Sequence, residues 1–175
     1  RAVVGDAIAL DTNISSGSGL TVETWFRTSD PALTDTALVF KWASADPSYV
    51  LHFAGIPNGA DAGGLRFELF DGTSLLSAES GSWYNDGFWH HAAGVWQDDT
   101  ARLYIDGFEV ASATVVGFGE LSDSTADLAV GAASVGGESG YFPGDVDEVR
   151  VWDVARTAEE IQSTLGKSLS GTEAG

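Results

Sequence analysis

Carboxylates are the most abundant groups in this sequence that could do chemistry. Its 175 residues include 26 aspartates and glutamates against 8 lysines and arginines, for a formal net charge of −18. Asp147 opens a run of alternating residues in which it shares one strand face with Val149 and Val151. The valine face should point into a core, where a carboxylate is costly unless it is paired, hydrogen-bonded or metal-bound. The pattern therefore predicts either a metal ligand at Asp147 or an aspartate that accepts backbone N–H groups where a strand starts.

Aromatic side chains are the second group of candidates, because sugar rings stack their C–H faces on flat aromatic rings. Trp25, Trp89, Trp96 and Trp152 lie in segments that alternate like strands, and we expect most of them in the core. Aromatic residues beside expected loops are better candidates for a surface role. These candidate ligand-binding residues are Trp42, Tyr49, Trp83, Tyr84 and Tyr141. The alternative for each is burial beneath a loop.

The histidines and the charges near the end of the chain indicate structural roles. His90 and His91 are adjacent in an expected strand, so they point to opposite faces and cannot both face one metal. Glu148 and Arg150 are expected on the strand face opposite Asp147 as part of an exposed cross-strand charge ladder, with a binding role as the alternative.

The residue patterns of common enzymes are missing from the sequence. A retaining glucanase places two carboxylates around the scissile bond, and neither Glu-x-Asp-x-Glu nor its one-residue-longer form occurs. Nucleophile-elbow, phosphate-binding-loop and zinc-protease motifs are also missing. The lack of cysteine excludes disulfides, thiolate-bound zinc and thiol catalysis. We therefore expect a protein that is not an enzyme.

The negative charge limits the partners of the chain. Nucleic acid and anionic membrane surfaces repel such a chain, so neither is expected as a partner. Solubility alone is a sufficient explanation of the charge, and calcium binding by some of the carboxylates is the alternative. The sequence has no apolar run approaching the roughly eighteen residues of a membrane span, so we expect no membrane insertion.

The hydrophobic pattern predicts an all-β protein with one short helix. Residues 88–96 have apolar side chains at both odd and even positions, which indicates a central strand buried on both faces. Asp106-Gly107 is a hairpin signal, and Thr157 with Glu160 forms a helix capping box. Further strands are expected over 20–28, 37–42, 49–54, 65–70, 102–105, 109–115, 127–132 and 146–152. About eleven strands favour a jellyroll sandwich of two antiparallel sheets, as a single domain over residues 1–175.

Four stretches also carry a family resemblance. They are L-T-V-E-T-W-F at 20–26, F-W-H-H-A-A at 88–93, R-L-Y-I-D-G at 102–107 and G-D-V-D-E-V-R-V-W at 144–152. In this order they resemble the bacterial LamG-like (laminin G-like) jellyroll domains of the concanavalin A-like lectin/glucanase superfamily. The resemblance covers nearly the whole chain and implies the same concanavalin A-like sandwich.

The resemblance also implies a structural calcium ion, a function and a location. Asp147 matches an aspartate that helps to hold calcium in related jellyrolls, and Gly5 and Asp6 are its nearest N-terminal partners. The implied function is a non-catalytic carbohydrate-binding or adhesion module, with a spacer or protein-interaction module as the alternative. We expect an extracellular or cell-surface domain of a larger, bacterial protein, with glycans, other extracellular proteins or neighbouring domains as partners.

Overall fold

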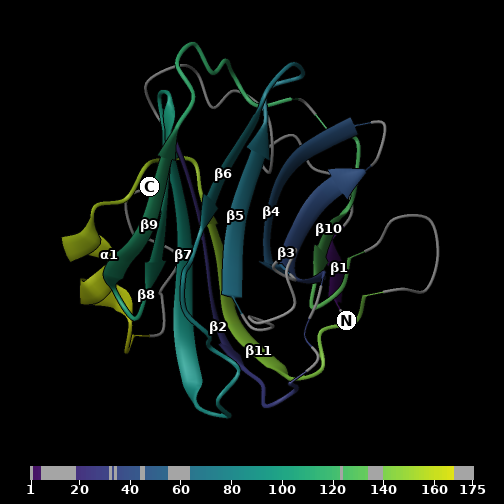
Figure 1. The fold of residues 1–175 in the computed structure, drawn as a ribbon, viewed down its shortest axis with the longest axis vertical. Coiled ribbons are helices and arrows are strands. Elements are labelled where there is room, and N and C mark those ends of the chain that lie inside the picture. Colours follow the sequence, from purple (N-terminus) through teal and green to yellow (C-terminus); the bar gives the residue numbers. More distant parts are fainter. Residues whose placement is uncertain are drawn as a thin grey trace.

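The structure, a computed structural model, describes residues 2–4, 19–31, 33, 35–43, 46–54, 64–122, 124–133 and 140–167. In these residues eleven strands form two facing antiparallel sheets, with one short helix outside them (Figure 1). Sheet A has the order β1 (Ala2–Val4), β10 (Leu128–Val130), β3 (Thr36–Ala43), β4 (Asp46–Ala54), β5 (Gly64–Phe70) and β6 (Leu75–Glu79). Sheet B has the order β11 (Asp145–Trp152), β2 (Leu20–Arg27), β7 (Trp89–Gln97), β8 (Thr100–Ile105) and β9 (Phe108–Thr114). The expected all-β jellyroll sandwich is confirmed.

The core lies between the two sheets and depends on one close approach. The central strand of sheet B, β7, is buried from His91 to Trp96, as expected for a strand covered on both faces. Within it, Gly94 lies against the ring of Phe67 from sheet A, and a Cβ atom at this position would clash with that ring. Glycine therefore allows the sheets to pack closely at the centre of the sandwich.

The hairpin between β8 and β9 has the turn that its sequence predicts. Asp106 and Gly107 have φ angles of 52° and 82°, the left-handed values of a tight two-residue turn. The Asp106 carboxylate also accepts a hydrogen bond of 2.8 Å from the backbone N–H of His91 and lies 2.8 Å from Nδ1 of His90. The two histidines point to opposite faces, as predicted, and share no site.

The last strand, β11, contains a bulge that its alternating sequence did not reveal. Asp147 lies opposite Trp25 of β2, while Arg150 lies opposite Glu23, so β11 has one residue more than β2 over this interval. The extra residue is accommodated around Glu148, whose φ of 50° is left-handed.

The bulge reverses the alternation of the side chains that precede it. Val149 and Val151 pack against the core as predicted, and Val146, expected on the opposite face, does so as well. Asp147 is exposed and shares the outer face of sheet B with its partner Trp25. The prediction of an inward-facing Asp147 is wrong, because one inserted residue moves every earlier side chain to the other face.

A buried charge cluster covers the outer face of sheet B. Glu23 is fully buried, and its Oε1 accepts hydrogen bonds from Arg150 at 3.3 Å, Arg156 at 3.1 Å and Trp152 at 3.1 Å. Nε2 of His91 lies 3.7 Å from the other carboxylate oxygen of Glu23. The guanidinium of Arg156 also lies over the Trp152 ring, 4.2 Å from its centroid. The cluster thus contains one carboxylate between two buried arginines.

The same arginines hold the C-terminal segment on the sheet. Arg150 pairs with Glu148 at 2.9 Å and, across the strands, with Glu23, but it is buried rather than exposed. It also donates to the Lys167 carbonyl at 2.8 Å. Arg156 donates to the carbonyl of Glu160 in the helix at 2.9 Å. The prediction of an exposed charge ladder is wrong for Arg150, because the C-terminal segment covers it.

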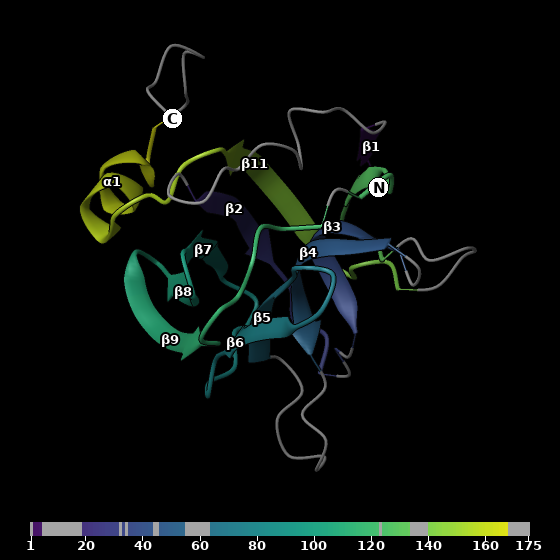
Figure 2. The ribbon, with the colours of Figure 1, turned by 90° about the horizontal axis from the view of Figure 1, so that it is seen from above.

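Helix α1 (Ala158–Thr164) has the predicted start and packs through one apolar side chain. The Thr157 hydroxyl accepts the N–H of Glu160, and the Glu160 carboxylate accepts the N–H of Thr157, which confirms the capping box. Ile161 is fully buried against outward-facing residues of β7 and β8. The helix therefore covers the outer face of sheet B and not that of sheet A (Figure 2).

We expect Glu23→Gln to destabilise the fold by about 3–5 kcal/mol, because it leaves two buried guanidinium groups without their shared counter-charge. Urea unfolding followed by circular dichroism measures the loss. Glu148→Gln removes the same charge from a side chain that is 39% exposed, and should cost less than about 1 kcal/mol. Equal losses in the free energy of unfolding would show that the buried Glu23 contributes no more to stability than the partly exposed Glu148.

The buried His91 makes stability depend on pH. Burial lowers its pKa to about 4, with Arg150 acting in the same direction and Glu23 opposing it. The unfolded histidine keeps its ordinary pKa of about 6.5, so between pH 6.5 and 4 only the unfolded chain binds this proton. The contribution of neutral, buried His91 to the free energy of unfolding is fully present above pH 6.5. It is lost as the pH falls from 6.5 towards 4, by on the order of 3 kcal/mol. His91→Gln should flatten unfolding free energy against pH over this window, and an unchanged slope would contradict the assignment.

Candidate functional site

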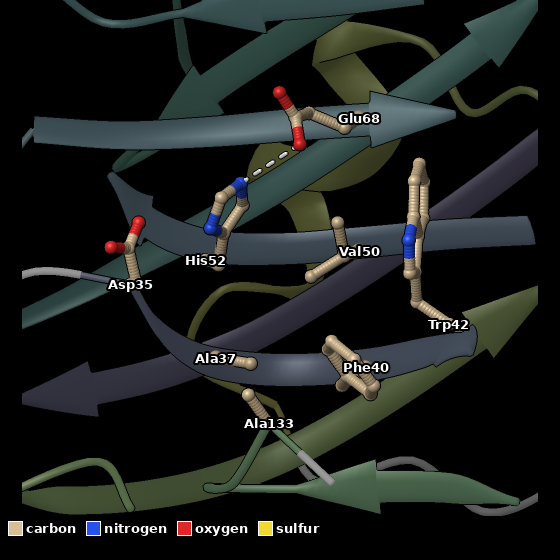
Figure 3. Close-up of a pocket in the computed structure, with 8 residues that line it drawn as sticks. All are labelled: Asp35, Ala37, Phe40, Trp42, Val50, His52, Glu68 and Ala133. Atoms are coloured by element: carbon tan, nitrogen blue, oxygen red, sulfur yellow. Dashed lines mark ion pairs between the residues drawn. The ribbon is translucent and has the colours of Figure 1, made fainter. Parts of the chain in front are cut away.

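A pocket of about 260 Å³ lies on the outer face of sheet A, away from the main core (Figure 3). It crosses β3, β4 and β5 and ends beside the segment that follows β10. Its lining residues are Asp35, Ala37, Phe40, Trp42, Val50, His52, Glu68 and Ala133.

Strand register brings the floor of the pocket together. Val50 of β4 lies between Phe40 of β3 on one side and Glu68 of β5 on the other, so the three form one row across the sheet. Ala37 and His52 are paired in the neighbouring row. In β4, Val50 and His52 are two residues apart and therefore share a face. In β3, a register shift between Ala37 and Val39 inserts one residue, so Leu38 and Val39 both enter the core while Ala37 and Phe40 both line the pocket.

Trp42 forms an aromatic wall at one end of the pocket (Figure 3). A register shift between Lys41 and Trp42 interrupts the pairing of β3 with β4 at this point. The Trp42 ring packs on Phe70 of β5, with 6.3 Å between centroids and an angle of 55° between planes. The contact with Phe70 helps to hold the indole in place beside the pocket.

Glu68 and His52 form the polar part of the pocket. Oε2 of Glu68 lies 3.2 Å from Nε2 of His52, although their orientation does not make a well-directed hydrogen bond. Oε1 accepts from Arg66 and from the Ser77 hydroxyl, both at 3.2 Å. Burial raises the pKa of Glu68, but its contacts with His52, Arg66 and Ser77 outweigh burial and lower that pKa overall. Glu68 is therefore an ionised acceptor at neutral pH.

Asp35 provides a second carboxylate at the end of the pocket away from Trp42 (Figure 3). The residue is exposed, and its φ of 50° is left-handed, a conformation that aspartate tolerates better than most side chains. Its carbonyl oxygen lies close to Gly140, which also touches Ala133 of the pocket wall. The pocket therefore combines an aromatic wall, an apolar floor and two carboxylates.

A second hollow of about 200 Å³ lies at the end of the sandwich where β2 ends and β11 begins. Its main charged groups bind each other, since Arg27 donates to Asp145 at 2.6 and 3.1 Å. The Arg27 guanidinium also lies 5.1 Å from the Trp89 ring centroid. These mutual contacts make it the weaker candidate for a ligand site.

Comparison with known proteins places the fold in a family. A family model described as the concanavalin A-like lectin/glucanases superfamily matches residues 4–162. The chain belongs to this superfamily. The LamG-like resemblance seen in the sequence is thereby confirmed at the level of the superfamily. A search of curated proteins found no match to the sequence.

Solved structures similar to this superfamily member include several carbohydrate-binding domains. One is domain 4 of AbnA, an extracellular arabinanase from Geobacillus stearothermophilus, in complex with arabinotriose, at 23% identity and TM-score 0.62, over 85% of this chain and 66% of that one. Another is the Ruminococcus gnavus sialidase CBM40 bound to α2,3-sialyllactose, at 17% identity and TM-score 0.64, over 86% and 84%. A third is a putative carbohydrate-binding protein from Bacteroides ovatus, at 16% identity and TM-score 0.65, over 91% and 43%. At these identities the likeness shows the fold.

The aromatic residues predicted to bind a ligand separate into three groups. Trp42 lines the pocket. Tyr49 is fully buried in the main core, so its predicted surface role is wrong; it lies inside β4, next to Val50 on the opposite face. Trp83 and Tyr141 are exposed by 57% and 52%, while Tyr84 is partly buried and meets His90 edge-on at 5.5 Å. The structure brings only Trp42 of this set to the pocket.

The tryptophans expected in the core also divide. Trp96 and Trp152 are buried, Trp25 is partly buried, and Trp89 is 40% exposed at the start of β7.

His52 and Glu68 were not proposed from the sequence, although a signal was present. Each alternates with core-facing leucines or phenylalanines in its strand, which predicts that both point away from the core.

The predicted calcium site lies only partly within the described residues. Asp147 is exposed, and its Oδ1 accepts the N–H of Glu148 at 2.8 Å. Gly5 and Asp6 lie outside the described residues. The residues that are described contain no group of three or more histidine or acidic side chains able to hold a metal ion, so they do not form a calcium site by themselves. The calcium ion therefore stays a prediction.

The described part of the chain contains no helix with the length and hydrophobicity that crossing a membrane requires.

We expect calcium at tenfold excess over its dissociation constant to stabilise the folded chain by about 1.4 kcal/mol, if Asp147 holds the ion with Gly5 and Asp6. Thermal melting of the chelated protein with and without 10 mM calcium measures this effect. Asp147→Asn should abolish the shift in midpoint, and Glu148→Gln, which removes the neighbouring charge, should retain it. An unchanged midpoint for the parent protein would reject the calcium prediction.

Proposed function

We propose that this chain is a non-catalytic carbohydrate-binding module of a larger extracellular or cell-surface protein. The observation that carries the proposal is the pocket on sheet A, where the Trp42 ring stands at one end, the Asp35 carboxylate at the other and the Glu68 carboxylate along the side between them (Figure 3). A sugar presents C–H groups on the faces of its ring and hydroxyl groups at its edge. An aromatic wall with acceptors opposite it matches both features.

The size of the pocket suits a short ligand. Pockets for drug-sized molecules span roughly 300–1,000 Å³, and this one measures about 260 Å³. One sugar ring, either alone or at the end of a chain, is the matching size. The floor formed by Phe40 and Val50 adds apolar surface beneath such a ring.

The similar structures support this proposal through their own ligands. The arabinanase domain was solved with arabinotriose and the CBM40 domain with sialyllactose. This chain spans 66% of the arabinanase chain and 43% of the Bacteroides ovatus protein. The activities of those whole proteins therefore bear on it only as proposals.

The chemistry of Glu68 argues against catalysis. A glycosidase needs one carboxylic acid with a raised pKa to protonate the leaving group. The pKa of Glu68 is lowered instead, because Arg66, Ser77 and His52 surround its two oxygens. Glu68 is thus suited to accept hydrogen bonds from a ligand and not to donate a proton to one.

A spacer or protein-interaction module is the second candidate. It is favoured by aromatic side chains exposed near one end of the sandwich, with Phe88 at 71% and Trp83 at 57%. These residues precede β7, on a different part of the surface from the lining of the pocket.

We expect Trp42→Ala to weaken binding to neutral oligosaccharides at least tenfold, because the variant loses the stacking surface of the pocket. A glycan array followed by calorimetry on the best neutral ligand measures the change. Trp83→Ala removes an indole outside the pocket and should retain binding, and circular dichroism should show that both variants are folded. Loss of binding in Trp83→Ala alone would move the site to the loop before β7, and no binding by the parent protein would favour the spacer.

A further inference from the structure

We propose that the pocket on sheet A selects neutral sugars and rejects sugars that carry a carboxylate or a sulfate. The proposal rests on the carbohydrate-binding function and adds a ligand class to the same site. It follows from the charged groups that surround the pocket and from the positions of the nearest cations.

The ionisable groups of the pocket are acidic or histidine. Asp35 and Glu68 are both among the lining residues, and no lysine or arginine is among the described residues that line it. Glu68 is ionised at neutral pH because its contacts lower its pKa in spite of burial. A ligand carboxylate placed beside Trp42 and Val50 would therefore approach negative charge.

The nearest cations are engaged with the protein. Arg66 donates to Glu68 at 3.2 Å and to Glu79 at 2.8 Å, so it lies between two carboxylates. Lys41 precedes Trp42 in β3 but is fully buried, and its ammonium donates to the carbonyls of Ser124 and Ala126 at 3.0 and 2.7 Å. The Nε of Arg66 is buried without a hydrogen-bond partner, but both terminal nitrogens of this guanidinium already donate to carboxylates, and a tightly bound anion takes two parallel donors.

The carboxylate oxygens of the pocket are suited to accept hydrogen bonds from hydroxyl groups. Oε2 of Glu68 lies 3.2 Å from Nε2 of His52 without a well-directed hydrogen bond, and a carboxylate oxygen can accept more than one. The exposed Asp35 adds acceptors at the mouth of the pocket. A sugar hydroxyl supplies the O–H donor that these groups need, whereas an acidic substituent supplies another acceptor. The formal net charge of −18 adds a long-range repulsion of the same sign.

A glycan array with matched pairs tests this inference. Each pair has one neutral oligosaccharide and the same oligosaccharide carrying one acidic residue, such as lactose and α2,3-sialyllactose. We expect neutral members to bind and their acidic partners to bind at least tenfold more weakly at pH 7 and low salt. The difference should shrink when salt is raised, because ions screen the repulsion.

Substitutions of the charged pocket residues test whether these charges cause the discrimination between neutral and acidic sugars. Glu68→Gln should raise the relative binding of the acidic partner at least threefold, because it removes one negative charge from the pocket and leaves Arg66 paired with Glu79 alone of its two carboxylates. Asp35→Asn, at the exposed end, should act in the same direction if Glu68→Gln fails to fold. Glu109→Gln removes the same charge from sheet B and should leave the ratio unchanged.

The outcomes separate the two proposals. Equal or tighter binding of the acidic partners would overturn the charge inference while carbohydrate binding stands. No binding to any array member would overturn the carbohydrate-binding proposal, and this inference with it.

Discussion

Successive side chains of a β-strand must point to opposite faces of its sheet, and the pocket depends on this constraint. In β4, Tyr49 and Leu51 enter the core, whereas Val50 and His52 form the pocket. The pocket floor is therefore the reverse side of the hydrophobic core. A change that shifts β4 by one residue would exchange the two sets of side chains, so the stability of the core and the lining of the pocket depend on the same strand register.

Irregularities in two strands modify this alternation where it matters. In β11, the residue inserted around Glu148 moves Asp147 outwards and leaves Val149 and Val151 on the core. In β3, the residue inserted between Ala37 and Val39 places Leu38 and Val39 together in the core and leaves Ala37 and Phe40 on the pocket. Bulges of this kind re-aim side chains, and in both strands the inserted residue changes which side chains face the core and which face outwards.

The two sheets use their outer faces differently. Sheet B is covered by helix α1 and by the ion cluster around Glu23, in which Arg150 and Arg156 are neutralised away from solvent. Sheet A carries the pocket, beside which Lys41 is likewise buried and bonded to carbonyl groups. These three cations are buried and bonded within the protein, so their nitrogen donors do not line the surface of the pocket.

Local signals in the sequence determined most of the fold. Two-residue alternation, the Asp106-Gly107 turn and the Thr157–Glu160 capping box each depend on neighbouring residues, and each was predictable. The site was predicted only at Trp42. Alternation also indicates that His52 and Glu68 point away from the core, but the sequence does not show which strands lie side by side.

Tertiary structure alone decided the rest. The Phe40–Val50–Glu68 row depends on the pairing of three strands, and the burial of Tyr49 and Arg150 depends on distant segments that cover them. The position of Asp147 depends on a bulge that only the register with β2 reveals. Alternation gives each side chain one of two faces, while inter-strand register decides what it meets there, and register is a property of segments far apart in the chain.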